Sequence, residues 1–201
     1  MILRNRLQYQ IKLFFDKVSS LLLLASLLPV FIIISILIKL DSHGPVIFKQ
    51  KRLGKNGKEF TIYKFRTMCD NAVTIGKGIF VAENDSRITR VGKLLRATSM
   101  DELPQLWNVF IGDMSLVGPR PPLPHHPYRY EEYPESHRKR FEVKPGITGL
   151  TQVTVRNSVP WEKRIAIDIE YITQYNYWLD IKILFKTAKK VFLRENIYTA
   201  Q

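Results

Sequence analysis

The sequence predicts an α/β protein that is mostly helical, with one short β-hairpin. Three observations predict it: a charge-free apolar run near the amino terminus, a hairpin-turn signal, and repeated helical spacing of apolar residues further on. The length of 201 residues suits one compact domain with an appendage. We therefore expect an N-terminal membrane-inserted helix over residues 1–40. A compact cytosolic domain with interfacial amphipathic helices should follow over residues 41–201.

The apolar run extends from Val18 to Ile38, 21 residues without a charge, which is long enough to cross a bilayer as a helix. Pro29 lies in its middle and removes an internal hydrogen bond, so a bend is expected there. Basic flanks prefer the cytoplasm, and both flanks are basic, which favours a re-entrant helix over the alternative of a straight span. The flanking residues are Arg4, Arg6, Lys12 and Lys17 before the run, and Lys39, Lys49, Lys51, Arg52, Lys55 and Lys58 after it.

A hairpin is predicted next. Val46–Phe48 suits a strand, Asn56-Gly57 is a turn signal, and Glu59–Met68 alternates enough to be the returning strand. Lys64 and Arg66 lie near the end of that strand, where they form either a solvated face or part of an anion site.

Patterns further along predict the remaining elements. Asp168 and Tyr171 should share a helix face. Asp168 is either a site residue or the partner of Arg164 in an ion pair along the helix. His125 and His126 invite zinc, but no third ligand supports it. The charged segment 130–140 should be a solvated helix face, and the last helix should pack on the core or lie in the headgroup layer. The predicted elements are a loop over 69–85, helices over 86–96, 103–110 and 130–140, a strand over 150–155, and helices from Pro160 and over 178–194.

Asp101 and Glu102 put two adjacent carboxylates into a strongly basic chain. Ser99 and Glu102 fit a capping box, in which the carboxylates only begin a helix. Alternatively, Pro104 begins the helix and both carboxylates lie just before it. Neighbouring side chains on a helix point about 100° apart, so the two carboxylates cannot share one task. One could act as a nucleophile or bind a metal while the other orients the first.

Basic residues around this pair could bind phosphate. Arg120 lies between Pro119 and Pro121, whose fixed φ angles make a rigid guanidinium suited to phosphate, although a plain surface turn is the alternative. Arg96, five residues before Asp101, is a second candidate.

Composition narrows the class of partner. The chain has 31 Lys and Arg against 18 Asp and Glu, a formal net charge of +13, and so should attract nucleic acid, anionic lipid or phosphorylated substrates. Nucleic-acid binding would not explain the apolar run or the carboxylate pair, so no nucleic-acid partner is expected. Cys69 is the only cysteine, which excludes an internal disulfide and fits a reducing compartment.

Several ordered motifs resemble the bacterial sugar transferase family, the small monotopic phosphoglycosyl transferases. The similarity covers the chain from about Lys12 to Leu193. The motifs are Gly44-Pro45-Val46-Ile47-Phe48-x-Gln50, Ile62-Tyr63-Lys64-Phe65-Arg66-Thr67-Met68, Ser99-x-Asp101-Glu102-Leu103-Pro104-Gln105-x-x-Asn108-Val109, Gly112-Asp113-Met114-Ser115-x-Val117-Gly118-Pro119-Arg120-Pro121, and Pro145-Gly146-Ile147-Thr148-Gly149.

The resemblance implies an enzyme that moves a sugar 1-phosphate from a UDP-sugar to undecaprenyl phosphate and releases UMP, which primes exopolysaccharide, capsule, lipopolysaccharide or other glycan synthesis. It implies a covalent intermediate on Asp101, and Mg²⁺ held by Asp101 and Glu102. It places the protein on the cytoplasmic face of the bacterial inner membrane, with the inner leaflet as partner, and allows a homodimer. A noncatalytic membrane scaffold is the alternative. The substrate-binding residues that we predict are Lys64, Arg66, Arg96, Pro119, Arg120, Pro121 and Asp168.

Overall fold

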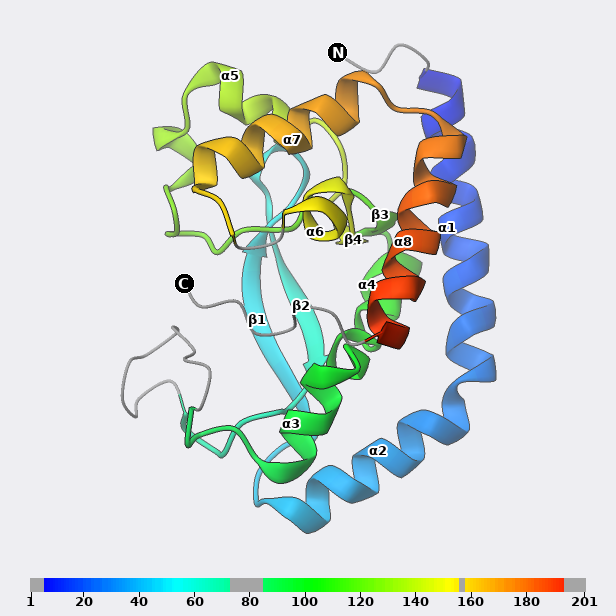
Figure 1. Ribbon diagram of the computed structural model, residues 1–201, viewed down its shortest axis with the longest axis vertical. Helices are drawn as coiled ribbons and strands as arrows, with labels where there is room; N and C mark the ends of the chain where they lie inside the picture. The colour runs from blue at the N-terminus through cyan, green and yellow to red at the C-terminus, as the bar shows by residue number, and fades with distance from the viewer. Residues whose placement is uncertain (1–5, 73–84, 156–157, 194–201) are drawn as a thin grey trace.

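The computed structural model describes residues 6–72, 85–155 and 158–193. Within these residues the fold is α/β and mostly helical, with two separate two-stranded sheets (Figure 1). The hairpin occupies the middle of the molecule, with α7 (Trp161–Thr173) across one end and α3 (Arg90–Ala97) toward the other. The predicted α/β and mostly helical class is therefore confirmed, while membrane insertion of the amino-terminal part stays a prediction.

Two helices joined at a sharp bend form the amino-terminal part. Helix α1 (Arg6–Ser26) and α2 (Leu28–Asp41) meet at 61°. Pro29 lies in the first turn of α2, where a missing N–H removes no helical hydrogen bond, and the Ser26 hydroxyl donates to the Leu23 carbonyl at 3.1 Å. The predicted bend is confirmed. Among the described helices none is long and apolar enough to span a membrane by itself, whereas α1 and α2 taken together meet that test.

Helix α1 also contributes to the core of the rest of the protein. Its Lys12 ammonium donates to Asp180 at 2.7 Å in α8 (Tyr177–Leu193), and its Asp16 accepts from the Ser115 hydroxyl at 2.5 Å. All of these groups are buried, and Figure 1 shows α8 lying beside α1. The division at residue 40 stays a prediction, but the first half of α1 packs as part of the globular body.

The predicted hairpin is confirmed. Strands β1 (Ile47–Leu53) and β2 (Glu59–Phe65) pair antiparallel, with Ile47 opposite Phe65. Between them, the turn η1 (Lys55–Gly57) has positive φ angles of 56° at Asn56 and 73° at Gly57. Asn and Gly tolerate that region better than other residues, so this dipeptide fixes the turn.

The capping-box prediction at Ser99 is wrong. Ser99 adopts a left-handed conformation with φ of 55°, and its side chain accepts no capping hydrogen bond. Met100–Glu102 form one 3₁₀ turn, η2, and Pro104 directly precedes α4 (Gln105–Ile111). The alternative, in which Pro104 begins the helix and the carboxylates lie before it, is therefore confirmed.

The strand predicted over residues 150–155 is also wrong. Leu150–Thr154 form the short helix α6, and the strand lies just before it: β4 (Gly146–Thr148) pairs in parallel with β3 (Ser115–Val117). Thr151 and Val153 are buried by the helix. The pairing joins segments about 30 residues apart, which local alternation does not reveal.

The single helix predicted over residues 130–140 is broken into three pieces. These are η3 (Tyr130–Glu132), α5 (Glu135–Arg138) and η4 (Lys139–Phe141), and Pro134 separates the first two. Pro cannot continue a helix interior, which explains the break. Most of the predicted loop over residues 69–85 lies outside the described residues.

Candidate active site

A cavity of about 870 Å³ brings most of the predicted site residues together. One part of its lining is charged and comes from β2, α3, η2 and the loop after β3. The other part is apolar and comes from the α1–α2 bend and from α8. The charged residues include Lys64, Arg96, Asp101, Glu102 and Arg120; the apolar ones include Leu23, Leu27, Val30, Leu184, Ala188 and Val191.

Glu102 is fixed by two cations from distant parts of the chain. Its Oε1 accepts from the Lys64 ammonium at 2.5 Å and from Arg120 Nη2 at 3.2 Å. Within the described residues, the neighbouring Asp101 carboxylate makes no such pair, although it lines the same cavity. The carboxylates therefore differ: Glu102 holds the two cations in place, and Asp101 faces the cavity.

Electrostatics separate the two carboxylates further. Burial alone would raise the pKa of Glu102, but Lys64 and Arg120 hold it well below its usual value. Burial raises the pKa of Asp101, which Lys64 opposes and Glu102 reinforces. The result is an ionised, immobilised glutamate beside a more basic aspartate.

Arg96 lies in the last turn of α3 and also lines the cavity. Its Nε donates to the Thr67 hydroxyl at 2.8 Å, just after β2. Helix α3 approaches this segment closely because Gly92 has no side chain: a Cβ there would lie 2.0 Å from the Thr67 carbonyl oxygen. Thr67 and Gly92 thus position Arg96.

Arg66 is placed elsewhere. It is buried, and its Nη2 donates to the Ser42 carbonyl at 2.7 Å and to the Ile38 carbonyl at 3.4 Å, at the carboxyl end of α2. A guanidinium suits this position because the last carbonyls of a helix lack intrahelical partners. Arg66 thus holds α2 and is not among the residues that line the cavity, and its predicted contact with substrate stays a prediction.

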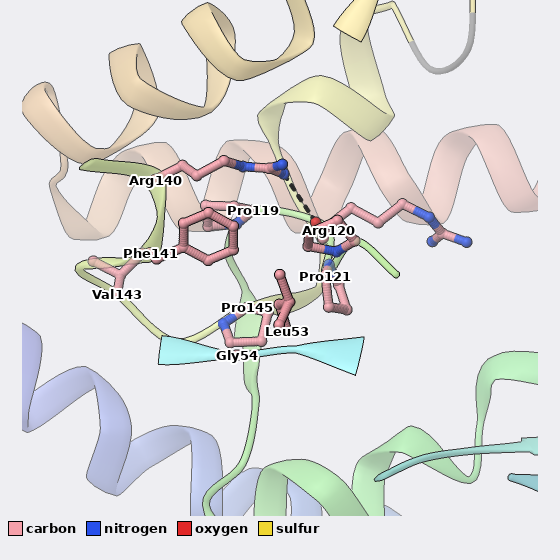
Figure 2. A pocket seen from close by; sticks show the side chains of 10 residues that line it. Leu53, Gly54, Pro119, Arg120, Pro121, Arg140, Phe141, Val143 and Pro145 are labelled. Carbon is pink, nitrogen blue, oxygen red and sulfur yellow. Dashed lines mark hydrogen bonds between the residues drawn. The ribbon is translucent and has the colours of Figure 1, made fainter. Parts of the chain in front are cut away.

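Pro119 and Pro121 also lie outside the large cavity. They line a separate, small pocket of about 10 Å³, together with Leu53, Phe141 and other apolar residues. In Figure 2 the prolines face this pocket while the Arg120 side chain points away from it. The packed prolines fix the backbone on each side of Arg120, and their predicted contact with substrate stays a prediction.

Asp168 lines the cavity, but both of its oxygens are engaged by protein. Oδ2 accepts from Arg140 Nη2 at 2.6 Å, and Oδ1 accepts from the Thr151 hydroxyl at 2.5 Å. Burial raises the pKa of Asp168, which Arg140 and Thr151 oppose. The alternative partner, Arg164, instead donates to the Val159 carbonyl at 2.8 Å, so that prediction is wrong.

Arg140 also lines the cavity, although no pattern in the sequence predicts a place for it in the site. It belongs to the charged segment expected to be solvated, yet it is 3% exposed. Its position in a run of Lys and Arg gave no local signal of burial.

The donor set at Asp101 and Glu102 is compatible with Mg²⁺. In the described part of the chain, no three His, Cys, Asp or Glu side chains gather as metal ligands. Mg²⁺ is commonly held by one or two carboxylates plus substrate phosphates, and the unpaired Asp101 and Oε2 of Glu102 could supply that number.

A cavity with this charged lining suits phosphorylated substrates, and its apolar lining suits a substrate that is partly lipid. This combination is compatible with a group-transfer enzyme that acts on phosphorylated compounds. The model of the bacterial sugar transferase family matches residues 7–194. The chain therefore belongs to that family and is an enzyme.

Named relatives support the same class. The chain is 42% identical over 187 residues to an uncharacterized sugar transferase, EpsL, of Bacillus subtilis, covering 93% of this chain and 90% of that protein. It is also 42% identical to UDP-glucose:undecaprenyl-phosphate glucose-1-phosphate transferases of Xanthomonas campestris and Escherichia coli, over 191 and 190 residues. Those matches cover 91% of this chain but only 39% and 40% of the relatives.

Proposed function

We propose that this protein transfers a sugar 1-phosphate from a UDP-sugar to undecaprenyl phosphate and releases UMP, as the priming step of polysaccharide or glycan synthesis. The observation that carries the proposal is one cavity that is lined by Asp101, Glu102 and several basic side chains, among them Lys64, Arg96 and Arg120, and also by the α1–α2 bend. A nucleotide sugar needs the charged lining, and a polyprenol phosphate needs both the charged lining and the apolar lining. The names of the relatives support this substrate pair.

Asp101 is the proposed nucleophile. Its carboxylate oxygen attacks the phosphorus that bears the sugar, the bond from that phosphorus to the UMP oxygen breaks, and UMP leaves with the bonding electrons. An oxygen of undecaprenyl phosphate then attacks the same phosphorus and expels the Asp101 carboxylate. The products are undecaprenyl diphosphate sugar and UMP.

The basic residues stabilise charge on the transferring phosphate. Arg120 and Arg96 reach the cavity from separate elements, and a positioned guanidinium can bind phosphate oxygens in pairs. Lys64 keeps Glu102 ionised, so Glu102 holds Arg120 in place. Asp101 and Glu102 would hold Mg²⁺ together with the donor's phosphates, and the bound ion would offset their negative charge.

The proposed location is the cytoplasmic face of the bacterial plasma membrane, with α1 and α2 entering and leaving the inner leaflet on one side. The support is the 61° bend, the basic flanks, and the apolar side chains that these helices expose. Exposed examples are Phe14, Leu22, Leu28, Ile33 and Leu40. Homodimer formation stays a prediction.

Intact-mass measurement after incubation with a UDP-sugar alone tests the proposal. Wild-type protein should gain the mass of a phosphosugar and release UMP, Asp101→Asn should do neither, and Asp113→Asn, outside the cavity, should behave as wild type. Full activity of Asp101→Asn would remove Asp101 as the nucleophile. Absence of UMP release across a panel of UDP-sugars would favour the noncatalytic scaffold.

A further inference from the structure

Arg140 and Asp168 form a buried ion pair in the lining of the catalytic cavity. Their side chains are 2% and 3% exposed, and Nη2 of Arg140 lies 2.6 Å from Oδ2 of Asp168. The Thr151 hydroxyl donates a hydrogen bond to the other carboxylate oxygen, Oδ1 of Asp168. The pair thus joins η4, α6 and α7.

The same Nη2 atom also reaches the Arg120 segment. It donates to the Arg120 backbone carbonyl at 3.0 Å, the bond drawn in Figure 2. Arg120 therefore has its backbone held by Arg140 and its side chain held by Glu102, while Pro119 and Pro121 restrict φ on each side.

We infer that Arg140 is a positioning residue, which acts by fixing the Arg120 backbone so that the Arg120 guanidinium meets the transferring phosphate. This inference rests on the proposed function. Arg140 itself need not touch substrate. A guanidinium displaced by about 1 Å can cost on the order of 100-fold in rate, so the backbone anchor has a large effect on the reaction.

Stability alone does not explain this buried arginine. Nε and Nη1 of Arg140 are buried and have no hydrogen-bond partner among the described residues. Unpaired buried donors are costly, and replacing a buried ion pair with apolar residues is often neutral or stabilising. The bond to the Arg120 carbonyl gives the arginine a role that an apolar residue could not take.

A double-mutant cycle tests the inference through kinetics. Arg140→Met should lower kcat for UMP release about 10- to 100-fold, with KM for the UDP-sugar changed less than about threefold. Arg140→Lys, which keeps the charge opposite Asp168 on a shorter side chain, should be intermediate. In an Arg120→Ala background, where the guanidinium is already gone, Arg140→Met should cost less than about threefold. Equal losses in both backgrounds would indicate a general structural role and overturn the inference.

Hydrogen exchange tests the inference without any substrate. In detergent, the peptide containing Gly118 and Arg120 should exchange at least about tenfold faster in Arg140→Met, while the β1–β2 hairpin should be unchanged. Unchanged exchange in that peptide overturns the inference, whether or not the protein is active. If Arg140→Met does not fold, Arg140→Lys provides the same comparison. If the exchange result holds but no UDP-sugar yields UMP, the proposed function fails while the anchoring of Arg120 stands.

Discussion

Lys64 should set the pH range in which Asp101 can act. Burial raises the pKa of Asp101, and Lys64 is the largest influence that opposes this rise. Lys64→Met removes the positive charge and keeps an apolar stem of similar length. The pKa of Asp101 should therefore rise, a smaller fraction should be ionised at a given pH, and the acidic limb of the activity profile should move to higher pH.

The size of the displacement of the acidic limb in Lys64→Met follows from the charges that remain around Asp101. An opposite charge within about 4–6 Å moves a carboxyl pKa by roughly one to three units. Glu102 loses the 2.5 Å contact with Lys64 but keeps the 3.2 Å contact with Arg120, so it stays ionised and continues to disfavour a second negative charge. We therefore expect the acidic limb to move up by about one to two pH units, a roughly 10- to 100-fold loss of activity on that limb.

The assay is kcat/KM for UMP release measured from pH 5 to pH 9, with the phosphosugar adduct followed by mass in parallel. Lys51→Met, an exposed lysine on the same hairpin, is the matched control and should keep the wild-type profile. A Lys64→Met profile that stays in place, or moves to lower pH, would refute the assignment of Asp101 as the titrating nucleophile controlled by Lys64.

Three further predictions concern stability and membrane contact. Lys12→Met should lower the free energy of unfolding by about 3–5 kcal/mol at neutral pH, because it leaves the buried Asp180 carboxylate with the Tyr171 hydrogen bond but without a cation. Burial raises the pKa of Asp180, and Lys12 opposes this rise. The loss of unfolding free energy in Lys12→Met should therefore be largest at pH values above the pKa of Asp180, and it should shrink as the pH falls and Asp180 takes up a proton. Gly92→Ala should cost about 1–3 kcal/mol in denaturant unfolding, because its Cβ would meet the Thr67 carbonyl. Trp178 is 72% exposed on α8, so Trp178→Phe should remove fluorescence that brominated lipids quench.

Matched substitutions keep these measurements interpretable. Lys17→Met changes an exposed lysine on the same helix as Lys12 and should leave stability nearly unchanged. Lys93→Ala places alanine next to Gly92 on the exposed side of α3 and should be close to neutral. Trp161→Phe, which changes a tryptophan of the cavity lining, should leave the lipid-quenched fluorescence in place. Equal effects of a control and its partner would contradict the corresponding prediction.

Features specified by neighbouring residues could be predicted from the sequence. Asn56-Gly57 fixes the hairpin turn because both residues accept positive φ. Pro29 fixes the helix bend because a proline cannot continue α1 but fits the first turn of a new helix, α2. Short segments also show directly that Asp101 is adjacent to Glu102 and that prolines flank Arg120. These local constraints hold whatever the rest of the chain does.

Features that depend on long-range contacts could not be predicted from local patterns. Arg140 and Arg66 resemble surface residues in the sequence, and their burial follows from partners 28 and 24 positions away, Asp168 and Ser42. The strand at Gly146–Thr148 exists because β3 lies beside it. A charged or glycine-containing segment carries no local signal of which distant element will cover it.

The environments of the two adjacent carboxylates argue for different chemical roles. Glu102 shares one oxygen between two cations, which makes it a weak base and holds it in place, so it is a poor nucleophile but a good anchor for Lys64 and Arg120. Asp101 is kept more basic by burial and by the negative charge beside it, and an oxygen that binds a proton more tightly also attacks phosphorus more readily. In the proposed reaction, the same two cations that immobilise Glu102 would offset the negative charge that develops on a phosphate attacked by Asp101. Both carboxylates lie on one 3₁₀ turn, so under the proposed mechanism Glu102 would organise the positive charge that the reaction of Asp101 requires.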